Sequence, residues 1–128
     1  MKERDLHKAV AQFLALALPK NAVWTTFPAG GGGTVRGAQL KARGLMAGWP
    51  DVQILWDGLF YGVELKAAHG RLSPEQRACG EAIAAAGGYY KIIRSLEELQ
   101  DWFPRVGIPL RASTGPAAKP GRKRGRAA

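Results

Sequence analysis

The segment Gly48–Lys66 reads GWPDVQILWDGLFYGVELK and contains the clearest structural signal in the chain. It holds two strand-like runs, Asp51–Trp56 and Leu59–Lys66, which are separated by the dipeptide Asp57-Gly58. This dipeptide between two apolar runs is among the strongest local signals for a two-residue β-hairpin turn. The segment therefore predicts an antiparallel hairpin, around which the rest of the chain can be placed.

A two-residue turn sets the register of the hairpin, so Trp56 faces Leu59 and, farther from the turn, Asp51 faces Glu64. Directly opposed residues have Cβ atoms about 4.5 to 5.5 Å apart, and like charges repel at that distance. Lys66 supplies one compensating charge, and a divalent cation held between the carboxylates would supply more. Carboxylate oxygens with no Cys or His beside them suit Mg²⁺ or Mn²⁺ rather than zinc.

Side chains along a strand point alternately to opposite faces of a sheet. We therefore expect one face of the hairpin to belong to the core and the other to carry the chemistry. The predicted core face holds Val52, Ile54, Tyr61, Val63 and Leu65, and the predicted chemical face holds Asp51, Gln53, Gly62, Glu64 and Lys66.

Three short motifs stand in and beside the hairpin: Ala47-Gly48-Trp49-Pro50-Asp51, Val63-Glu64-Leu65-Lys66 and Gly70-Arg71-Leu72-Ser73-Pro74-Glu75-Gln76. Together they resemble the virus-type replication-repair nuclease (VRR-NUC) family of the PD-(D/E)xK nuclease superfamily. The likeness covers about residues 3–103. It implies an α/β fold of the mixed α+β type, with a restriction-endonuclease-like core in the order αβββαβ and a small mixed sheet flanked by helices.

The resemblance also implies an activity, that of a Mg²⁺- or Mn²⁺-dependent endonuclease that hydrolyses phosphodiester bonds of DNA. Stand-alone members of the family look like structure-specific enzymes of phage or bacterial replication and repair, some resembling dimeric Holliday-junction resolvases. Branched DNA, a possible homodimer and a cytoplasmic location are therefore expected. Two alternatives stay open: a monomeric flap or nicking nuclease, and a DNA-binding module of the same fold with weak or no catalysis.

Individual roles follow from the same resemblance. Asp51 and Glu64 would bind the metal together with the main-chain carbonyl of Leu65. Lys66 would stabilise the negative charge of the transition state or orient the attacking water. These residues are the core of the predicted catalytic site.

Two further residues have both a structural and a functional interpretation. In the resembling family a glutamate on the N-terminal helix completes the metal site, and Glu3 is the best positional match, with Asp5 as the substitute; an acid here also favours the positive end of a helix. Gln76 closes a capping box with Ser73, and the resemblance implies that it also faces the metal site and orients water or phosphate. His7 is expected to face solvent or substrate.

A glycine-rich loop at residues 30–33 precedes Arg36, Lys41 and Arg43. Glycine removes side-chain bulk and cations neutralise phosphates, so we predict a mobile loop that approaches a nucleic-acid backbone, with Arg71 as a further contact. The Gly-x4-Gly-Lys-Ser/Thr pattern of a P-loop is absent, which argues against nucleotide hydrolysis. The alternative is a solvated connection with ordinary surface cations.

Apolar periodicity and capping signals predict the other elements. A crossover helix between two strands makes those strands parallel, so the strand at 89–94 is expected to be buried and parallel to a neighbour. The helices are predicted over 2–18, 38–44, 74–86 (Ala78, Ile83 and Ala86 inward) and after Ser95 (Leu99, Trp102 and Phe103 inward), with a first strand over 23–27.

The 128-residue chain carries a net charge of +9, and five of its cations lie from Ala112 onward with no acid among them. We predict a nuclease domain over 1–111 and a disordered basic tail over 112–128. The excess of cations indicates a polyanion such as DNA as partner, and the tail either holds its phosphates or only keeps the protein soluble. Apolar runs are too short for a membrane span, and the single Cys79 suits a reducing compartment.

Overall fold

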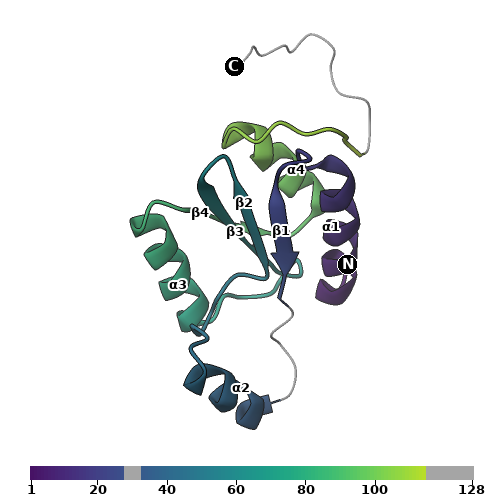
Figure 1. Ribbon diagram of the computed structural model, residues 1–128. Coiled ribbons are helices and arrows are strands. Elements are labelled where there is room, and N and C mark those ends of the chain that lie inside the picture. The colour runs from purple at the N-terminus through teal and green to yellow at the C-terminus, as the bar shows by residue number, and fades with distance from the viewer. Residues whose placement is uncertain (28–32, 115–128) are drawn as a thin grey trace.

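The predicted hairpin forms the centre of the structure, a four-stranded sheet with helices on both faces (Figure 1). The computed structural model describes residues 1–27 and 33–114. Within them, the hairpin strands are β2 (Val52–Trp56) and β3 (Leu59–Leu65). The expected mobility of the loop before residue 33 and the expected disorder of the tail from residue 115 onward lie outside the described residues.

The register of the hairpin is the predicted one, since Val52 pairs with Val63 along the two strands. Asp57 and Gly58 form the turn with φ angles of 53° and 78°. A type I′ turn needs positive φ at both central residues, which is why this dipeptide is suited to it.

Two more strands extend the hairpin on either side. β1 (Val23–Thr26) pairs antiparallel with β2, and β4 (Tyr89–Ile93) pairs parallel with β3, so the order is β1-β2-β3-β4. The crossover from β3 to β4 contains α3 (Pro74–Ala85), as a parallel connection requires. The predicted parallel pairing is therefore confirmed.

Helices cover both faces of this sheet (Figure 1). α1 (Glu3–Ala17) and α4 (Leu96–Arg105) lie on one face, and α3 lies on the other. A further helix, α2 (Gly33–Ala42), lies apart from the sheet between β1 and β2 in the chain, and it is longer than the predicted helix at 38–44. The mixed α+β fold with a small mixed sheet is thus confirmed, with α2 inserted into the predicted order.

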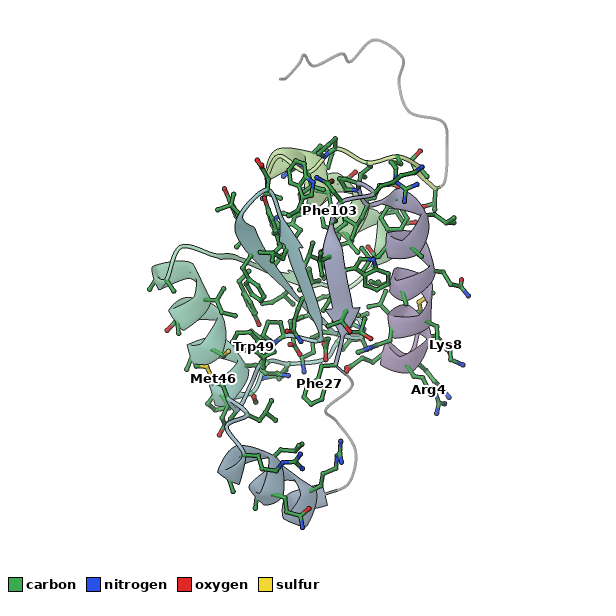
Figure 2. The ribbon with its side chains drawn as sticks, viewed as in Figure 1. Arg4, Lys8, Phe27, Met46, Trp49 and Phe103 are labelled. Atoms are coloured by element: carbon green, nitrogen blue, oxygen red, sulfur yellow. The ribbon has the colours of Figure 1, made fainter. Side chains whose placement is uncertain are left out.

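The main core lies between the sheet and the pair α1 and α4. Phe103 on α4 is fully buried there, between the helices and the strands (Figure 2). The predicted core face of the hairpin and the predicted inward side of α4 are both buried, which confirms these assignments. Their partners from α1 are Leu6, Val10, Phe13, Leu14 and Ala17.

The second face of the hairpin, on which the chemistry is predicted, is covered by α3, which leaves Glu64 only 1% exposed. The buried residues of α3 are Cys79, Gly80 and Ile83, whereas the predicted Ala78 and Ala86 are exposed. A Cβ on Gly80 would lie 2.5 Å from the Tyr90 ring, so the helix packs against β4 on its glycine side. β4 itself is an edge strand, and it is less buried than expected.

The chain beyond α4 runs back along the body of the protein. The backbone N–H of Arg111 donates to the Ala17 carbonyl at 2.7 Å, and Thr114 and Gln100 exchange hydrogen bonds. These contacts extend through the last described residues, while the division at residue 111 stays a prediction. In the described part of the chain, no helix combines the length and the apolar character needed to cross a bilayer.

Candidate active site

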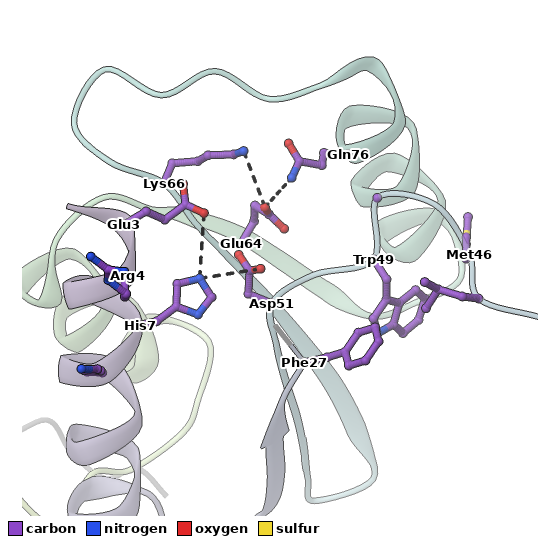
Figure 3. A pocket seen from close by; sticks show the side chains of 13 residues that line it. Glu3, Arg4, His7, Phe27, Met46, Trp49, Asp51, Glu64, Lys66 and Gln76 are labelled. Carbon is purple, nitrogen blue, oxygen red and sulfur yellow. Dashed lines mark hydrogen bonds and ion pairs between the residues drawn. The ribbon is translucent and has the colours of Figure 1, made fainter. Parts of the chain in front are cut away.

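Asp51 and Glu64 face each other where the hairpin strands end farthest from the turn (Figure 3). The backbone N–H of Leu65 donates a 2.8 Å hydrogen bond to Asp51 Oδ2. The Asp51 carbonyl in turn accepts a 2.8 Å hydrogen bond from the Phe27 N–H at the end of β1. Two strands therefore hold Asp51 in place beside Glu64, as the register predicts.

The Leu65 backbone is turned toward this site, away from β4. Lys66, the next residue, donates its N–H to the Ile93 carbonyl of β4, and successive residues of a strand turn their N–H and C=O groups to opposite sides. In an antiparallel ladder, the N–H and C=O of one residue point to the same neighbouring strand. Because the Leu65 N–H points to Asp51, its carbonyl also opens toward Asp51 rather than toward β4.

Glu64 is a buried carboxyl with unusual electrostatics. Burial, and next the charge of Asp51, raise the pKa of Glu64 to about 8, while Lys66 acts in the opposite direction. Lys66 Nζ lies 3.9 Å from Glu64 Oε2. The other oxygen, Glu64 Oε1, is buried and has no hydrogen-bond partner among the described residues. Buried polar atoms are normally paired. A hydrogen bond with Asp51 also contributes to the raised pKa of Glu64, so the two carboxyls lie close enough to share a proton or, in its place, a cation.

Gln76 both caps α3 and contacts the acidic pair, the two roles that the sequence left open. Its backbone N–H donates to Ser73 Oγ at 3.1 Å, and its Oε1 accepts the Ser73 N–H at 2.9 Å, so the capping box is present. Its Nε2 donates to Glu64 Oε2 at 2.7 Å. Because Oε1 is occupied by the cap, Nε2 is the end of the amide that must face Glu64, and the helix cap orients the site.

The N-terminal turn of α1 brings two side chains to the carboxylates. His7 Nε2 lies 3.8 Å from Asp51 Oδ1 and 4.0 Å from Glu3 Oε2 (Figure 3). Glu3 lines the cavity described below and Asp5 does not, so the geometry favours Glu3 of the two predicted candidates. Of the two predicted surroundings of His7, solvent or substrate, the structure supports the second, since His7 lines the cavity. Its spacing of four residues from Glu3 is the signal that was present, since such residues share a helix face.

These side chains border a cavity of about 730 Å³. Its wall is acidic at the hairpin, cationic along α1 and apolar where the chain enters β2. The lining residues are Glu3, Arg4, His7, Lys8, Phe27, Leu45, Met46, Gly48, Trp49, Asp51, Glu64, Lys66 and Gln76.

The donor set at this cavity fits a hard divalent cation. Asp51 and Glu64 line the cavity and would supply oxygen ligands together with the Leu65 carbonyl, and Glu64 Oε1 is a buried oxygen with no partner among the described residues. No three His, Cys, Asp or Glu side chains within residues 1–27 and 33–114 form a closed metal-binding cluster. Mg²⁺ commonly binds one or two carboxylates and keeps several of its waters.

Comparison with known proteins bears on the fold. A solved structure of a VRR_NUC domain protein matches with a TM-score of 0.65, covering 82% of this chain and 87% of that chain at 16% sequence identity. The two chains share a fold. No protein-family model matches the sequence, so the VRR_NUC resemblance is supported at the level of the fold alone.

A sequence match of a different kind is to the human (Homo sapiens) spectrin beta chain, non-erythrocytic 4. It is 40% identical over 53 residues, which is 41% of this chain. The matched segment spans about 2% of that spectrin chain, and it assigns no family.

The cations predicted to bind nucleic acid lie elsewhere on the VRR_NUC fold. Arg36 and Lys41 on α2, Arg43 just after it, and Arg71 before α3 are all exposed, and none lines the cavity. Besides the predicted Lys66, two cations that were not predicted line it: Arg4 and Lys8, one turn apart on α1. DNA contacts by the four predicted residues stay a prediction.

The raised pKa of Glu64 predicts that the metal-free protein loses stability as the pH rises. Between pH 4.5 and about 8, the folded protein keeps a proton that the unfolded chain has released, so unfolding becomes easier with increasing pH. In EDTA, the unfolding free energy of the wild type should fall by on the order of a few kcal/mol relative to Glu64→Gln across this window.

Urea unfolding at several pH values measures this difference. Glu81→Gln, on the exposed side of α3, is the matched control and should follow the wild type. Parallel pH profiles for the wild type and Glu64→Gln would show that burial leaves the Glu64 carboxyl unperturbed.

Proposed function

We propose that this protein is a Mg²⁺- or Mn²⁺-dependent endonuclease that hydrolyses phosphodiester bonds of DNA. The observation that carries the proposal is the buried Glu64, whose Oε1 lacks a partner among the described residues while Asp51 faces it across the hairpin. The fold shared with a VRR_NUC domain protein and the lysine beside the acids support the same function.

Asp51, Glu64 and the Leu65 carbonyl would hold the metal, with Glu3 completing the shell directly or through water. A bound divalent cation supplies Lewis-acid polarisation of the phosphate and lowers the pKa of a bound water. The two acids would therefore provide most of the binding of the cofactor, and the Leu65 backbone, whose N–H donates to Asp51, lies beside them.

The remaining residues act directly on the substrate or on the acids. Water adds to phosphorus as the bond to the leaving oxygen breaks, and negative charge grows on the phosphate oxygens. Lys66, with Nζ 3.9 Å from Glu64 Oε2, places a positive charge where that charge grows. Gln76 fixes the orientation of Glu64, and His7 positions Glu3 against Asp51.

The finer parts of the proposal concern substrate and setting. A net charge of +9 favours DNA as the polyanion, and we assign branched or otherwise structured DNA as the preferred substrate. A homodimer acting on such DNA in the cytoplasm of a bacterial or phage-infected cell fits the same proposal. A cleavage panel of hairpin, flap, fork and four-way substrates ranks these structures, and sedimentation gives the oligomeric state.

The decisive experiment compares cleavage with binding of the metal. Supercoiled DNA should be nicked or linearised in Mg²⁺ or Mn²⁺ and left intact in EDTA, and calorimetry should detect Mn²⁺ binding to the wild type. Cleavage that persists in EDTA would contradict the proposal. Mn²⁺ binding without cleavage of any substrate would instead identify a DNA-binding module that does not turn over.

A further inference from the structure

One wall of the cavity is apolar and partly exposed beside the acids. Phe27, Leu45, Met46 and Trp49 line it, and they are named here the apolar shelf. Phe27 follows β1 directly, and the other three precede β2. Met46 is 46% exposed, and Phe27, Leu45 and Trp49 are half-buried. Figure 2 shows Phe27, Met46 and Trp49 gathered at the same end of the sheet.

The packing beneath the shelf holds it in position. The Trp49 ring packs against Phe60 with centroids 5.6 Å apart, and Met46 Sδ lies 3.8 Å from Cys79 Sγ on α3. Gly48, with φ of 80°, lets this segment press on α3, because a Cβ there would lie 2.3 Å from the Glu75 carbonyl oxygen. Contacts with Phe60 and α3 therefore hold the apolar shelf in place, and its opposite side faces the cavity.

The other side of the cavity carries positive charge. Arg4 and Lys8 are exposed on α1 and line the cavity together with Glu3 and His7. One cavity of about 730 Å³ thus combines an apolar surface with two aromatic rings, an acidic centre with Lys66 beside it, and two further cations on α1. Small-molecule sites are commonly about 300–1,000 Å³, so a nucleotide-sized group fits this space.

We propose that the apolar shelf stacks the base of an unpaired nucleotide next to the scissile phosphate, while Arg4 and Lys8 hold a neighbouring phosphate. This inference rests on the proposed function and names its substrate class: DNA with unpaired nucleotides, such as an overhang, flap or fork, rather than continuous duplex.

The chemistry of the shelf separates these substrates. In a duplex, each base is stacked between its neighbours and presents only its edges in the grooves. An unpaired base presents its flat face, which aromatic side chains bind with little regard to sequence. Trp49 and Phe27 can therefore engage a nucleotide that has left the stack.

The test is DNA binding by the full chain in EDTA, followed by fluorescence anisotropy. Three probes share one duplex: a blunt end, a short single-stranded overhang, and the same overhang with abasic nucleotides. The two overhangs carry identical backbone charge, so contributions from the basic tail cancel. The wild type should bind the base-bearing overhang roughly 5- to 150-fold more tightly than the abasic one. Equal affinities would overturn the inference.

Variants locate the effect on the shelf. Trp49→Leu keeps an apolar side chain over Phe60 and should lose most of the preference, whereas Trp49→Phe should regain part of it. Phe27→Leu gives the same comparison without disturbing the contact with Phe60. Leu55→Ala, on an exposed part of β2, is the matched control and should keep the preference. Full preference in both leucine variants would overturn the assignment.

Cleavage in Mg²⁺ is measured separately with the same probes. A protein that cuts DNA but binds the abasic overhang equally well refutes the stacking inference alone. A protein that prefers the base-bearing overhang and never cuts refutes the proposed endonuclease function alone.

Discussion

The Glu64→Ala variant is expected to leave supercoiled and branched DNA intact under Mg²⁺ conditions in which the wild type cuts it. Glu64 is the more deeply buried acid of the pair, and its loss would remove a metal ligand. β3 carries no second acid that could take its place. A catalytic metal supplies several kcal/mol, and at about 1.4 kcal/mol per factor of ten the rate should fall by roughly 10³-fold or more.

Unfolding must be separated from loss of the site. Glu64→Gln keeps the volume of the side chain and removes the repulsion with Asp51, so it should fold well and still fail to cut. Calorimetry should show weakened Mn²⁺ binding in both variants, and thermal melting should show a folded protein. Glu81→Ala, on the exposed side of α3, should cut like the wild type. Equal cleavage by the wild type and Glu64→Ala would refute the metal assignment.

Lys66→Met has the second largest expected effect. The Lys66 side chain is 13% exposed and its Nζ lies 3.9 Å from Glu64 Oε2, so its charge acts in a space from which much water is excluded. Removal of one group that stabilises developing charge typically lowers kcat by about 10²- to 10³-fold. Methionine keeps the apolar stem, so the loss reports the charge rather than the packing.

Single-turnover kinetics and DNA binding distinguish two roles for Lys66. A residue that acts in the transition state should lower kcat and kcat/KM together, with little change in the DNA dissociation constant. Lys91→Met, an exposed lysine on β4, is the matched control. A raised KM with an unchanged kcat would make Lys66 a simple phosphate contact.

Sequence reasoning predicted the hairpin and the meeting of the two acids. The turn at Asp57-Gly58 has the positive φ angles that its residues favour, and the register then places Asp51 beside Glu64. The cap of α3 was equally readable, because Ser73 and Gln76 are only three residues apart. These features depend on neighbours in the chain, so local composition is enough to predict them.

Features that depend on distant segments were missed. The sequence alone does not show that α3 covers Glu64. Of the predicted inward residues of α3, Ile83 is buried, but Cys79 and Gly80 take the place of Ala78 and Ala86. The Tyr90 ring packs against α3 at residue 80, where there is no room for a Cβ, so the glycine side of α3 faces the sheet. For His7, the sequence does not decide between solvent and substrate, and the packing of α1 brings it between Glu3 and Asp51.

The amino-acid sequence by itself therefore determined which two carboxylates meet. A two-residue turn sets the register of the hairpin, and the register gives each residue of one strand a single facing residue on the other. Only the tertiary structure decided what those carboxylates become. The packing of α3 buries Glu64 and raises its pKa to about 8, and the approach of α1 closes the cavity with His7, Arg4 and Lys8. Burial and electric field depend on all the atoms around a group, and most of those atoms belong to residues far away in the chain.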